Sequence, residues 1–419
     1  MQPASTALRP LVQETLGAEA QVRFEFWDGS VLGPRTGVGP VKVRSPEAVR
    51  RIMWSPGELG AARAYVCGEL DTDGDLSEVL RALRDTAPEG VRPRLLLAAG
   101  RALKDLSLPA GRPPPPPEEA RPVGRLHSRS RDRKAVSHHY DVGNEFYSLV
   151  LGPTMTYSCA RFAEPTMSLE EAQASKYELI CRKLGLHERR EMRLLDVGCG
   201  WGSMAIHAAR EHGARVVGVT VSQSQADLGR KRVADAGVAD AVEIRLQDYR
   251  DVADGPYDAI SSIGMFEHVG AQRMGEYFSR LRSLLVPTGR LLNHAISSAT
   301  GSKLGARGFM GRYVFPDGEL LGVAEVVAGM EDAGFEVRDV ESLREHYAAT
   351  LRRWLSNLES GWERAVELVG ERRARAWRLY MTGSSLGFED GGIAVHQVLG
   401  VVPGTDGTSG MPPTRAGWP

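Results

Sequence analysis

Three glycines in the stretch LLDVGCGWGS, residues 194–203, have the spacing of a backbone turn that binds a nucleotide-like cofactor. The apolar run before them, residues 194–197, predicts a buried parallel strand, and a helix is expected directly after the turn. A dinucleotide-binding turn reads G-x-G-x-x-G and has an acid after the next strand, whereas this turn reads G-x-G-x-G. The next strand pattern is followed by Thr220, Ser222 and Gln225. The pattern therefore disfavours NAD and favours S-adenosylmethionine (SAM).

Two residues suited to acid–base chemistry lie at the ends of two further predicted strands. Glu267 comes after YDAISSIG, and His294 lies in GRLLNHAIS. In an open α/β sheet, ligands bind beyond the carboxyl ends of the parallel strands, so both side chains are expected near the cofactor. A single histidine at a strand end is more often structural than catalytic, but the nearby glutamate strengthens the catalytic interpretation.

The elements that must position these groups alternate between strand and helix patterns. Ser168 and Glu171 have the spacing of a capping box, which predicts the start of an amphipathic helix before the glycine-rich strand. Five strand patterns are separated by helical or turn segments: LLDVGCG, ARVVGVT, AVEIRLQD, YDAISSIG and GRLLNHAIS. This alternation predicts an α/β fold with a doubly wound, Rossmann-like sheet.

A smaller α+β domain is expected before this sheet. VRFEFWDGS predicts a strand with a hairpin turn at Asp28-Gly29, and Ser45 is positioned as the N-cap of a helix. A second short helical pattern follows in LSEVLRALR. Five consecutive prolines, residues 113–117, predict a stiff polyproline segment between the domains. The expected boundaries are 1–110 for the α+β domain, 111–130 for a Pro-rich linker, 131–402 for the α/β domain and 403–419 for a disordered Gly/Pro-rich tail.

Bulk properties exclude several classes of protein. The 52 Lys and Arg residues balance 53 Asp and Glu residues, so overall charge indicates no nucleic-acid partner. The first 17 residues lack a basic segment before an apolar core, and no apolar run approaches the roughly 20 residues that cross a bilayer, so a cytoplasmic protein is expected. The cysteines lie far apart without C-x-x-C spacing, which predicts neither a disulfide scaffold nor a metal site. They are Cys67, Cys159, Cys181 and Cys199.

Six motifs in a fixed order make the chain resemble the cyclopropane-fatty-acid synthase family, which includes mycolic-acid methyltransferases. They are HYDVGNEFYSLVLGPTMTYSCARF, LLDVGCGWG, GVTVSQSQ, LQDYRD, GMFEHVG and YVFPDG. The resemblance covers roughly residues 130–400, and the segment YVCGELDTDGDLSEVLRAL extends it to the leading, lipid-associated domain of the longer bacterial synthases. It implies transfer of a methyl group from SAM to the double bond of an unsaturated acyl chain in a membrane phospholipid.

The resemblance also assigns site residues. Those implied to contact SAM are Tyr157, Ser158, Asp196, Gly198, Gly200, Thr220, Gln225, Asp248, Tyr249 and Ile263. Those implied to hold bicarbonate as a general base are Cys159, Glu267, His294, Ile296 and Tyr347. From the residues alone, Cys159 is equally well explained as a buried small hydrophobic side chain.

The product depends on which proton leaves after methyl transfer. Loss from the new methyl group closes a cyclopropane ring, whereas a hydride shift followed by proton loss leaves an exocyclic methylene. The Arg-rich composition and the stretch RLYMTGSSLGFEDGGIAVHQVLG resemble the actinobacterial branch that makes 10-methyl(ene) fatty acids. Glu145 stands where the family usually has aspartate, and we expect it to assist proton removal and to favour the methylene product. A cyclopropane synthase and a small-molecule SAM methyltransferase remain the alternatives.

The resemblance implies partners as well as chemistry. The substrate is expected in unsaturated phospholipids at the inner face of the membrane, and the basic run from Arg125 to Lys134 could contact anionic head groups or be a solvated segment. A flavin- or NADPH-dependent reductase could act on a methylene product. We also expect a homo-oligomer.

Overall fold

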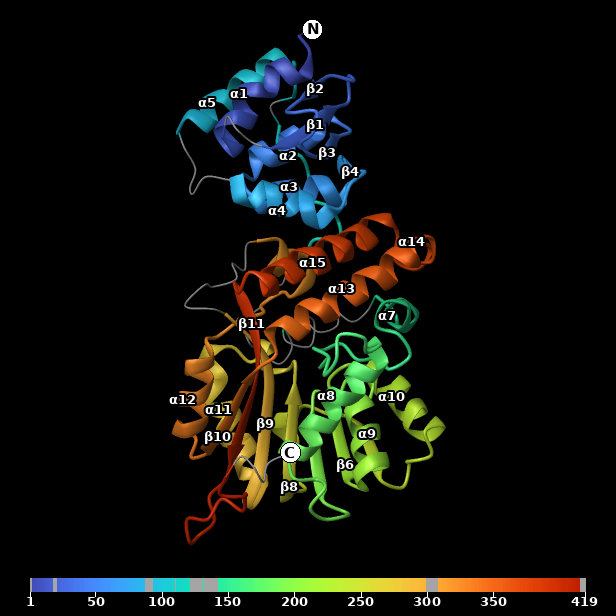
Figure 1. Ribbon diagram of the computed structural model, residues 1–419, viewed down its shortest axis with the longest axis vertical. Coiled ribbons are helices and arrows are strands. Elements are labelled where there is room, and N and C mark those ends of the chain that lie inside the picture. The colour runs from blue at the N-terminus through green and yellow to red at the C-terminus, as the bar shows by residue number, and fades with distance from the viewer. Residues whose placement is uncertain are drawn as a thin grey trace. The chain divides into compact units, whose positions relative to one another are not determined.

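The computed structural model describes residues 2–17, 21–86, 93–109, 111–120, 131, 142–298 and 308–414 (Figure 1). These residues divide into two compact units that are interleaved along the chain. Unit 1 comprises Met1–Arg121, Arg307–Val314 and Trp362–Leu386. Unit 2 comprises Pro122–Ala306, Phe315–Gly361 and Gly387–Pro419. The units therefore differ from the expected linear domains, because two segments from the second half of the chain belong to unit 1.

Unit 1 is an α+β unit with a four-stranded sheet in the order β2-β1-β3-β4. The strands are β1 (Val22–Phe26), β2 (Val31–Leu32), β3 (Val38–Val43) and β4 (Leu70–Thr72). Its helices include α1 (Ala4–Leu16), α2 (Pro46–Trp54), α3 (Glu58–Val66), α4 (Leu76–Thr86), α5 (Pro93–Asp105), α14 (Trp362–Val369) and most of α15 (Glu371–Glu389). The expected hairpin between β1 and β2 and the Ser45 N-cap, which accepts a hydrogen bond from the Glu47 amide, are both confirmed.

The proline-rich segment packs on unit 1. Pro113 and Pro116 are buried, whereas Pro114 and Pro117 are exposed, and a repeat of three residues is that of a polyproline II helix. Arg51 donates a hydrogen bond of 2.8 Å to the Pro114 carbonyl oxygen. The first half of the expected linker is therefore bonded to α2 and α3, while residues 121–130 lie outside the described residues.

Two further arginines in unit 1 are buried. Arg63 makes a two-pronged ion pair with Glu119, at 2.7 and 2.8 Å. Arg375 of α15 donates to the carbonyl oxygens of Tyr65 and Leu70, each at 2.6 Å. These bonds attach α15 to α3 and β4 although about 300 residues separate them.

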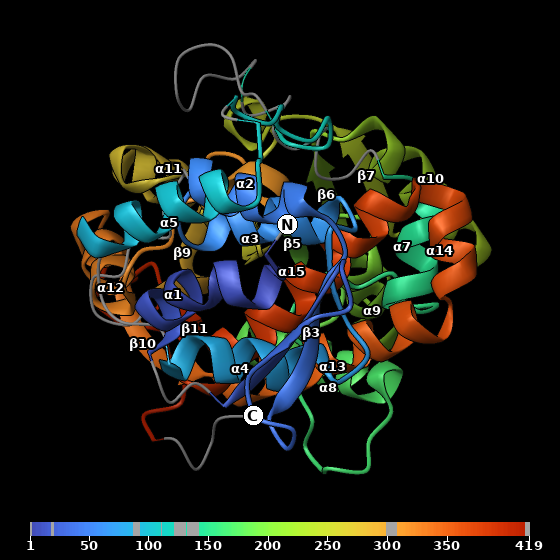
Figure 2. The ribbon, with the colours of Figure 1, turned by 90° about the horizontal axis from the view of Figure 1, so that it is seen from above.

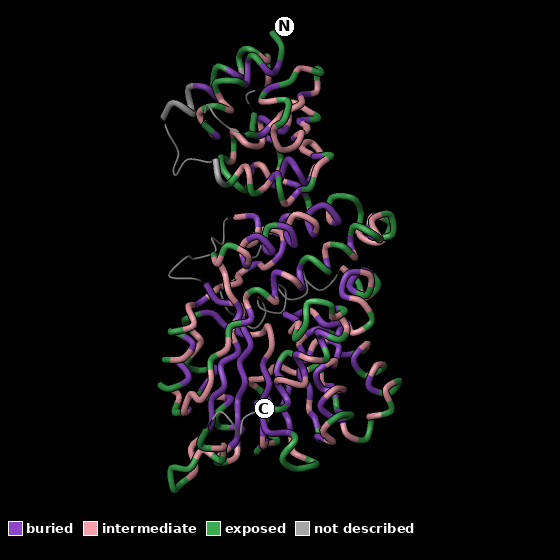
Figure 3. Tube along the Cα trace, in the orientation of Figure 1, coloured by how far each residue is buried: buried purple, intermediate pink, exposed green. Residues whose placement is uncertain are grey.

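Unit 2 is built on a seven-stranded sheet in the order β10-β11-β9-β8-β5-β6-β7, whose strands are largely buried (Figure 3). The strands are β5 (Arg193–Val197), β6 (Arg215–Thr220), β7 (Val242–Leu246), β8 (Tyr257–Ile263), β9 (Leu285–Ser298), β10 (Glu336–Ser342) and β11 (Ile393–Val401). β5 to β9 are parallel, and β11 runs antiparallel to both of its neighbours. Because the strand order reverses at β5, a crevice is expected at its carboxyl end.

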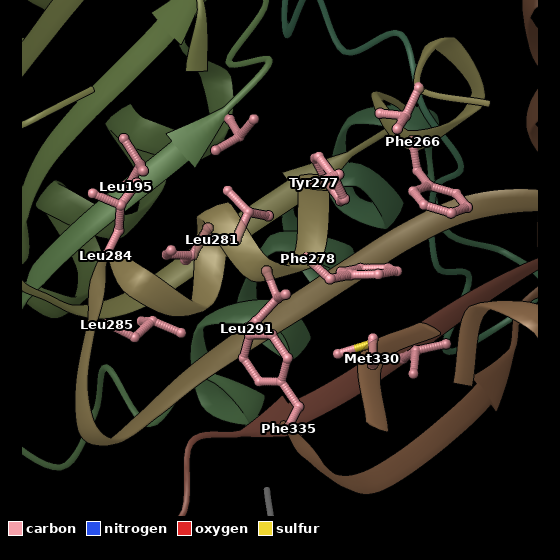
Figure 4. Close-up of a cluster of buried hydrophobic side chains, with 14 of the residues drawn as sticks. Leu195, Phe266, Tyr277, Phe278, Leu281, Leu284, Leu285, Leu291, Met330 and Phe335 are labelled. Carbon is pink, nitrogen blue, oxygen red and sulfur yellow. The ribbon is translucent and has the colours of Figure 1, made fainter. Parts of the chain in front are cut away.

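Helices cover both faces of this sheet. The main helices of unit 2 are α7 (Asn144–Leu151), α8 (Leu169–Lys183), α9 (Ser203–His212), α10 (Gln223–Asp235), α11 (Met274–Ser283), α12 (Val323–Asp332) and α13 (Arg344–Ser360). Leu194 packs in a cluster with α8, α9 and α10, whereas its neighbour Leu195 packs in a second cluster with α11 and α12. Figure 2 shows α11 and α12 well separated from α9 and α10, and Figure 4 shows part of the second cluster, with Leu195 near Leu281 and Leu284. This alternation confirms the doubly wound α/β fold.

All five expected strands of the α/β domain are present, and so is the capping box of α8 at Ser168 and Glu171. The strands β10 and β11 were not predicted. β10 has four charged residues in seven and lies at the edge of the sheet, where charge is tolerated. The structure describes the expected disordered tail as far as Thr414, and Arg290 donates to the Gly410 carbonyl oxygen at 2.9 Å. Among the described residues, no helix combines the length and apolar character that a membrane span requires.

Candidate active site

A cavity lies at the carboxyl ends of β5, β6, β7 and β8, where the strand order reverses. Its lining includes every residue for which the sequence predicts a contact with SAM. These are Tyr157, Ser158, Asp196, Gly198, Gly200, Thr220, Gln225, Asp248, Tyr249 and Ile263. Segments up to 106 residues apart in the chain, from Tyr157 to Ile263, therefore meet at one place. Their roles toward the cofactor remain predictions.

The glycine turn after β5 requires glycine at two of its positions. Gly198 and Gly200 have φ angles of +77° and +54°, a region that residues with a Cβ rarely adopt. A Cβ on Gly198 would lie 2.9 Å from Cγ of Met265, which is too close. A Cβ on Gly200 would meet no atom within 4 Å, although Gly200 lines the cavity. The backbone of Gly200 therefore faces open space that a ligand can fill.

Asp196 supplies a buried carboxylate to the cavity. Its Oδ1 atom accepts a 2.7 Å hydrogen bond from the Ser261 hydroxyl, while its Oδ2 atom is buried and accepts none from the described residues. Burial raises the pKa of Asp196 to about 6, and the hydrogen bond from Ser261 and the nearby Lys176 oppose this rise. A polar ligand in the cavity would supply the missing donor.

Lys176 of α8 is a buried cation that the sequence interpretation missed. Its Nζ atom donates to the Ser158 hydroxyl at 2.9 Å, and Gln173 donates to the Ser158 carbonyl oxygen at the same distance. Burial lowers the pKa of Lys176 to about 7, against the opposing effects of Cys159 and Asp196. In sequence, Lys176 stands in an amphipathic helix rich in charges, so no local signal separates it from a surface lysine. Here it positions Ser158 at the cavity.

Two other predicted cofactor residues bond to each other. The Thr220 hydroxyl donates to Oε1 of Gln225 at 2.8 Å and accepts from the Ser222 amide at 3.2 Å. These bonds shape the turn after β6. The Thr220 hydroxyl therefore has fewer hydrogen-bonding positions left for a ligand than the sequence suggests. Asp248, after β7, is bonded to Arg250 at 2.6 and 2.8 Å.

The predicted base-holding residues form a second cluster beside the cavity. Glu267, just after β8, accepts a 2.7 Å hydrogen bond at Oε1 from the Ile296 amide of β9. Its Oε2 atom is buried and has no hydrogen-bond partner among the described residues. Burial raises the pKa of Glu267 to about 7, although the Ile296 amide stabilises the carboxylate.

His294 precedes Ile296 by two residues on β9, so both side chains lie on the same face of the sheet. The Gln397 amide nitrogen of β11 donates to His294 Nδ1 at 3.3 Å. Burial, with the nearby Lys176, lowers the pKa of His294 to about 3, so the ring is neutral. Because Nδ1 accepts, the proton is on Nε2, which is buried without a partner among the described residues. This nitrogen is a donor suited to an anion.

Cys159 and Tyr347 meet at the carbonyl oxygen of Leu343. The Cys159 sulfur lies 3.6 Å from this oxygen, and the Tyr347 amide donates to it at 3.1 Å. Leu343 in turn donates to the Val395 carbonyl oxygen at 2.9 Å, and Val395 pairs with Ile296 in the sheet. Burial raises the pKa of the Cys159 thiol, so it is not a thiolate nucleophile. Contacts through β9, β11 and the start of α13 thus link five of the six predicted catalytic residues, and their catalytic roles remain predictions.

Glu145 is the sixth, and it lies elsewhere. It is exposed in the first turn of α7 and is not among the residues that line the cavity. Its neighbour Asn144 has the structural role at this point, because it accepts hydrogen bonds from Trp201 at 2.9 Å and Ser224 at 3.1 Å.

Aromatic rings adjoin the cavity on one side. Tyr157 lies 5.3 Å from Trp354 and 5.5 Å from Tyr147, and Tyr347 lies 4.6 Å from Phe388, between ring centres. The sequence interpretation missed Trp354 because it stands in a helix with no motif around it. Such a wall excludes water and can stabilise positive charge.

Comparison with known proteins agrees with this geometry. Residues 127–398 match the model of the family described as mycolic acid cyclopropane synthetase. The chain belongs to this family. It is 43% identical over 412 residues to a "probable fatty acid methyltransferase" of Mycobacterium tuberculosis, with 95% of each chain covered. It is 32% identical over 363 residues to the cyclopropane-fatty-acyl-phospholipid synthase of Escherichia coli, with 86% of this chain and 87% of that protein covered.

A solved structure of a relative supports SAM as the cofactor. The crystal structure of mycolic acid cyclopropane synthase CmaA1 in complex with SAH and CTAB matches with a TM-score of 0.61 and 35% identity, covering 64% of this chain and 98% of that chain. SAH is what remains of SAM after methyl transfer. The chain is therefore a SAM-dependent enzyme of the group that methylates or cyclopropanates fatty acids.

Proposed function

We propose that this enzyme transfers the methyl group of SAM to the double bond of an unsaturated acyl chain in a membrane phospholipid. The observation that carries the proposal is the pair of buried atoms without partners, Glu267 Oε2 and His294 Nε2, beside a cavity suited to SAM. Methyl transfer to an alkene leaves a carbocation, which must be kept from water and must then lose a proton. The site has both an aromatic wall and polar groups for this purpose.

The residues fit a bicarbonate ion as the bound base. Its hydroxyl group can donate to Glu267 Oε2, and its negatively charged oxygens can accept from His294 Nε2. When bound, bicarbonate supplies a base of moderate strength that can take up the leaving proton. The chain's own contribution is to hold Glu267 through the Ile296 amide and the His294 ring through Gln397.

SAM supplies the electrophilic methyl group when it is bound. The new C–C bond forms as the C–S bond breaks, leaving SAH and a carbocation on the acyl chain. The rings of Tyr157, Trp354 and Tyr347 would face this charge, and their contact with one another keeps water out. No covalent intermediate with Cys159 is needed.

We favour the methylene product, which a separate flavin- or NADPH-dependent reductase could convert to a methyl branch. Support comes from the relative at 43% identity, whose name describes a fatty acid methyltransferase. The cyclopropane ring is the alternative, because the relative at 32% identity is named a cyclopropane synthase. Both products arise from one carbocation, so they differ only in which proton leaves.

Lipid analysis tests the proposal. The chain would be expressed in a host that has unsaturated phospholipids but makes no methylated acyl chains, with methyl-labelled methionine as the source of label. We expect labelled phospholipid acyl chains of unchanged length that carry one additional carbon. Hydrogenation distinguishes the products, because a methylene takes up two hydrogens under conditions that leave a cyclopropane intact. Label only in water-soluble compounds would contradict the proposal and favour a small-molecule methyltransferase.

A further inference from the structure

Three potential metal ligands lie between α8 and α9, outside the cofactor cavity. The ligand atoms of Cys181, His207 and His212 all lie within 4.8 Å of one another. Cys181 is on α8, and both histidines are on α9, which packs beside α8 (Figure 1). None of the three lines the cavity described above.

A carboxylate completes the group. Glu178 lies one helical turn before Cys181, and its Oε2 atom is 2.9 Å from Nε2 of His212 and 3.6 Å from Nε2 of His207. Ligand atoms around a tetrahedral zinc ion are roughly 3.3–3.5 Å apart, as follows from Zn–N and Zn–S bonds of about 2.0 and 2.3 Å. The distances from Glu178 Oε2 to the two histidine nitrogens, 2.9 and 3.6 Å, lie on either side of that range. To hold one ion, the thiol and both rings must close from separations of up to 4.8 Å to roughly 3.5 Å.

The surroundings favour an ion over a packed helix contact. Nε2 of His207 is buried without a hydrogen-bond partner among the described residues, which is costly unless something else occupies that position. Arg182 donates to the other oxygen of Glu178 at 2.7 Å and so leaves Oε2 directed at the histidines. This arrangement resembles the outer hydrogen bonds that orient ligands in metal sites.

We propose that Glu178, Cys181, His207 and His212 form a structural site for a divalent zinc ion that joins α8 to α9. One thiolate, two imidazoles and one carboxylate are a donor set for zinc, whereas magnesium and calcium prefer oxygen alone. Four protein ligands leave no open position, so the ion has a structural role and not a catalytic one. The sequence did not reveal the site because its ligands come from two helices and lack C-x-x-C spacing.

The site would stabilise the cofactor cavity from a distance. α8 also carries Gln173 and Lys176, which hold Ser158, and α9 begins directly after the glycine turn. An ion between these helices therefore ties together two elements whose other ends shape the cavity. Because the folded chain presents the ligands together, zinc should raise its unfolding temperature.

Cobalt titration tests the proposal. The full-length protein, without an affinity tag and stripped by a chelator, would be titrated with Co²⁺ and then with Zn²⁺. We expect one Co²⁺ per chain, the intense visible absorption of a tetrahedral site, a thiolate-to-cobalt charge-transfer band, and displacement by Zn²⁺. Cys181→Ser should abolish the charge-transfer band and weaken Zn²⁺ binding by about 100-fold or more, and the rise in unfolding temperature with Zn²⁺ should disappear.

Matched variants identify the ligands. Cys67→Ser in unit 1 and His187→Ala, an exposed histidine just after α8, should bind both metals as the unaltered chain does. If Cys181→Ser does not fold, His207→Gln and His212→Gln take its place, and each should weaken Zn²⁺ binding by about 10-fold or more. Retention of the charge-transfer band in Cys181→Ser would overturn the proposal. So would Zn²⁺ affinity that is unchanged in both folded histidine variants, or absorption by Co²⁺ typical only of six oxygen ligands.

Discussion

Glu267 is the residue on which the proposed chemistry depends most. Glu267→Gln keeps the shape of the side chain but replaces Oε2, the proposed acceptor for bicarbonate, with a donor. We expect affinity for SAM within a few-fold of the unaltered enzyme, since Glu267 does not line the cofactor cavity. Turnover should fall by roughly 10² or more, the usual effect of a positioned acid or base. Isothermal titration with SAM and a labelled-methyl assay measure the two quantities, and Glu211→Gln on the exposed end of α9 is the control.

The same variant has a predictable effect on stability. The pKa of Glu267 is raised in the folded chain from 4.5 to about 7, so folding favours the protonated acid. Its contribution to stability is complete below about pH 4.5 and is lost as the pH rises through about 7. At pH 8, Glu267→Gln should therefore be more stable than the unaltered chain by up to roughly 3 kcal/mol, since 1 pKa unit is about 1.4 kcal/mol. Urea unfolding of both proteins at pH 5 and pH 8 measures this difference. The prediction is contradicted if the free energies of unfolding of the variant and the unaltered chain differ by the same amount at both pH values.

In contrast to Glu267, we expect replacement of Glu145 to have little effect on turnover. The sequence suggested a carboxylate that assists proton removal, but the side chain is exposed in the first turn of α7. An acid at that position stabilises the start of a helix, and Glu145 does not line the cavity. Glu145→Ala and Glu145→Asp should therefore leave the rate within about 2-fold and the ratio of methylene to cyclopropane unchanged. A changed product ratio in the lipid assay would restore Glu145 to the mechanism.

Among the structural elements, we expect the turn between β5 and α9 to be sensitive to substitution. Gly200→Val introduces a branched side chain at φ +54°, with open cavity space where its Cβ would lie. Gly237→Val is a matched control, because it has a similar φ of +71° and equally open surroundings but lies on the surface after α10. Both should cost stability through backbone strain. Only Gly200→Val should abolish SAM binding, which titration of the folded variants would show.

For the whole molecule, the feature to test is the contact with a lipid surface. The described residues contain no helix that could span a membrane. The basic run from Arg125 to Lys134 lies outside the described residues except for Arg131, which pairs with Asp317. If this run contacts anionic head groups, each basic residue near the surface contributes about 1 kcal/mol at low salt. Replacing Arg125 and Arg129 with alanine should then weaken binding to anionic vesicles roughly 30-fold.

Vesicle sedimentation at two salt concentrations distinguishes this contact from general attraction. Added salt should weaken binding of the unaltered chain, because it screens exposed charge. Replacement of Arg190 and Arg210, which are exposed on unit 2, removes the same charge from another place and should have a smaller effect. Equal effects of the two double replacements would show that the basic run is an ordinary solvated segment.

Local patterns in the sequence were sufficient to predict five of the seven strands, and the motifs that carry the family resemblance contained the residues that line the cavity. Strand periodicity and the glycine turn depend on residues close together in the chain, and each predicted cofactor residue belongs to a motif a few residues long. The carboxyl ends of parallel strands necessarily meet at one edge, so Asp196, Thr220 and Asp248 could be placed together without coordinates. The hairpin at Asp28-Gly29 and the capping box at Ser168 were predictable for the same reason.

Burial and pairing between distant segments could not be predicted in this way. Lys176 stands in a helix rich in charge and Glu145 in a mostly apolar helix, yet packing buries the lysine and leaves the glutamate exposed. α15 joins unit 1 through Arg375, whose partners lie about 300 residues earlier. Cys181 meets His207 and His212 only because α8 packs on α9. The pKa of Glu267 depends on which elements bury this side chain and exclude water from it. Burial is a property of the folded chain and cannot be read from the residues next to Glu267 in the sequence.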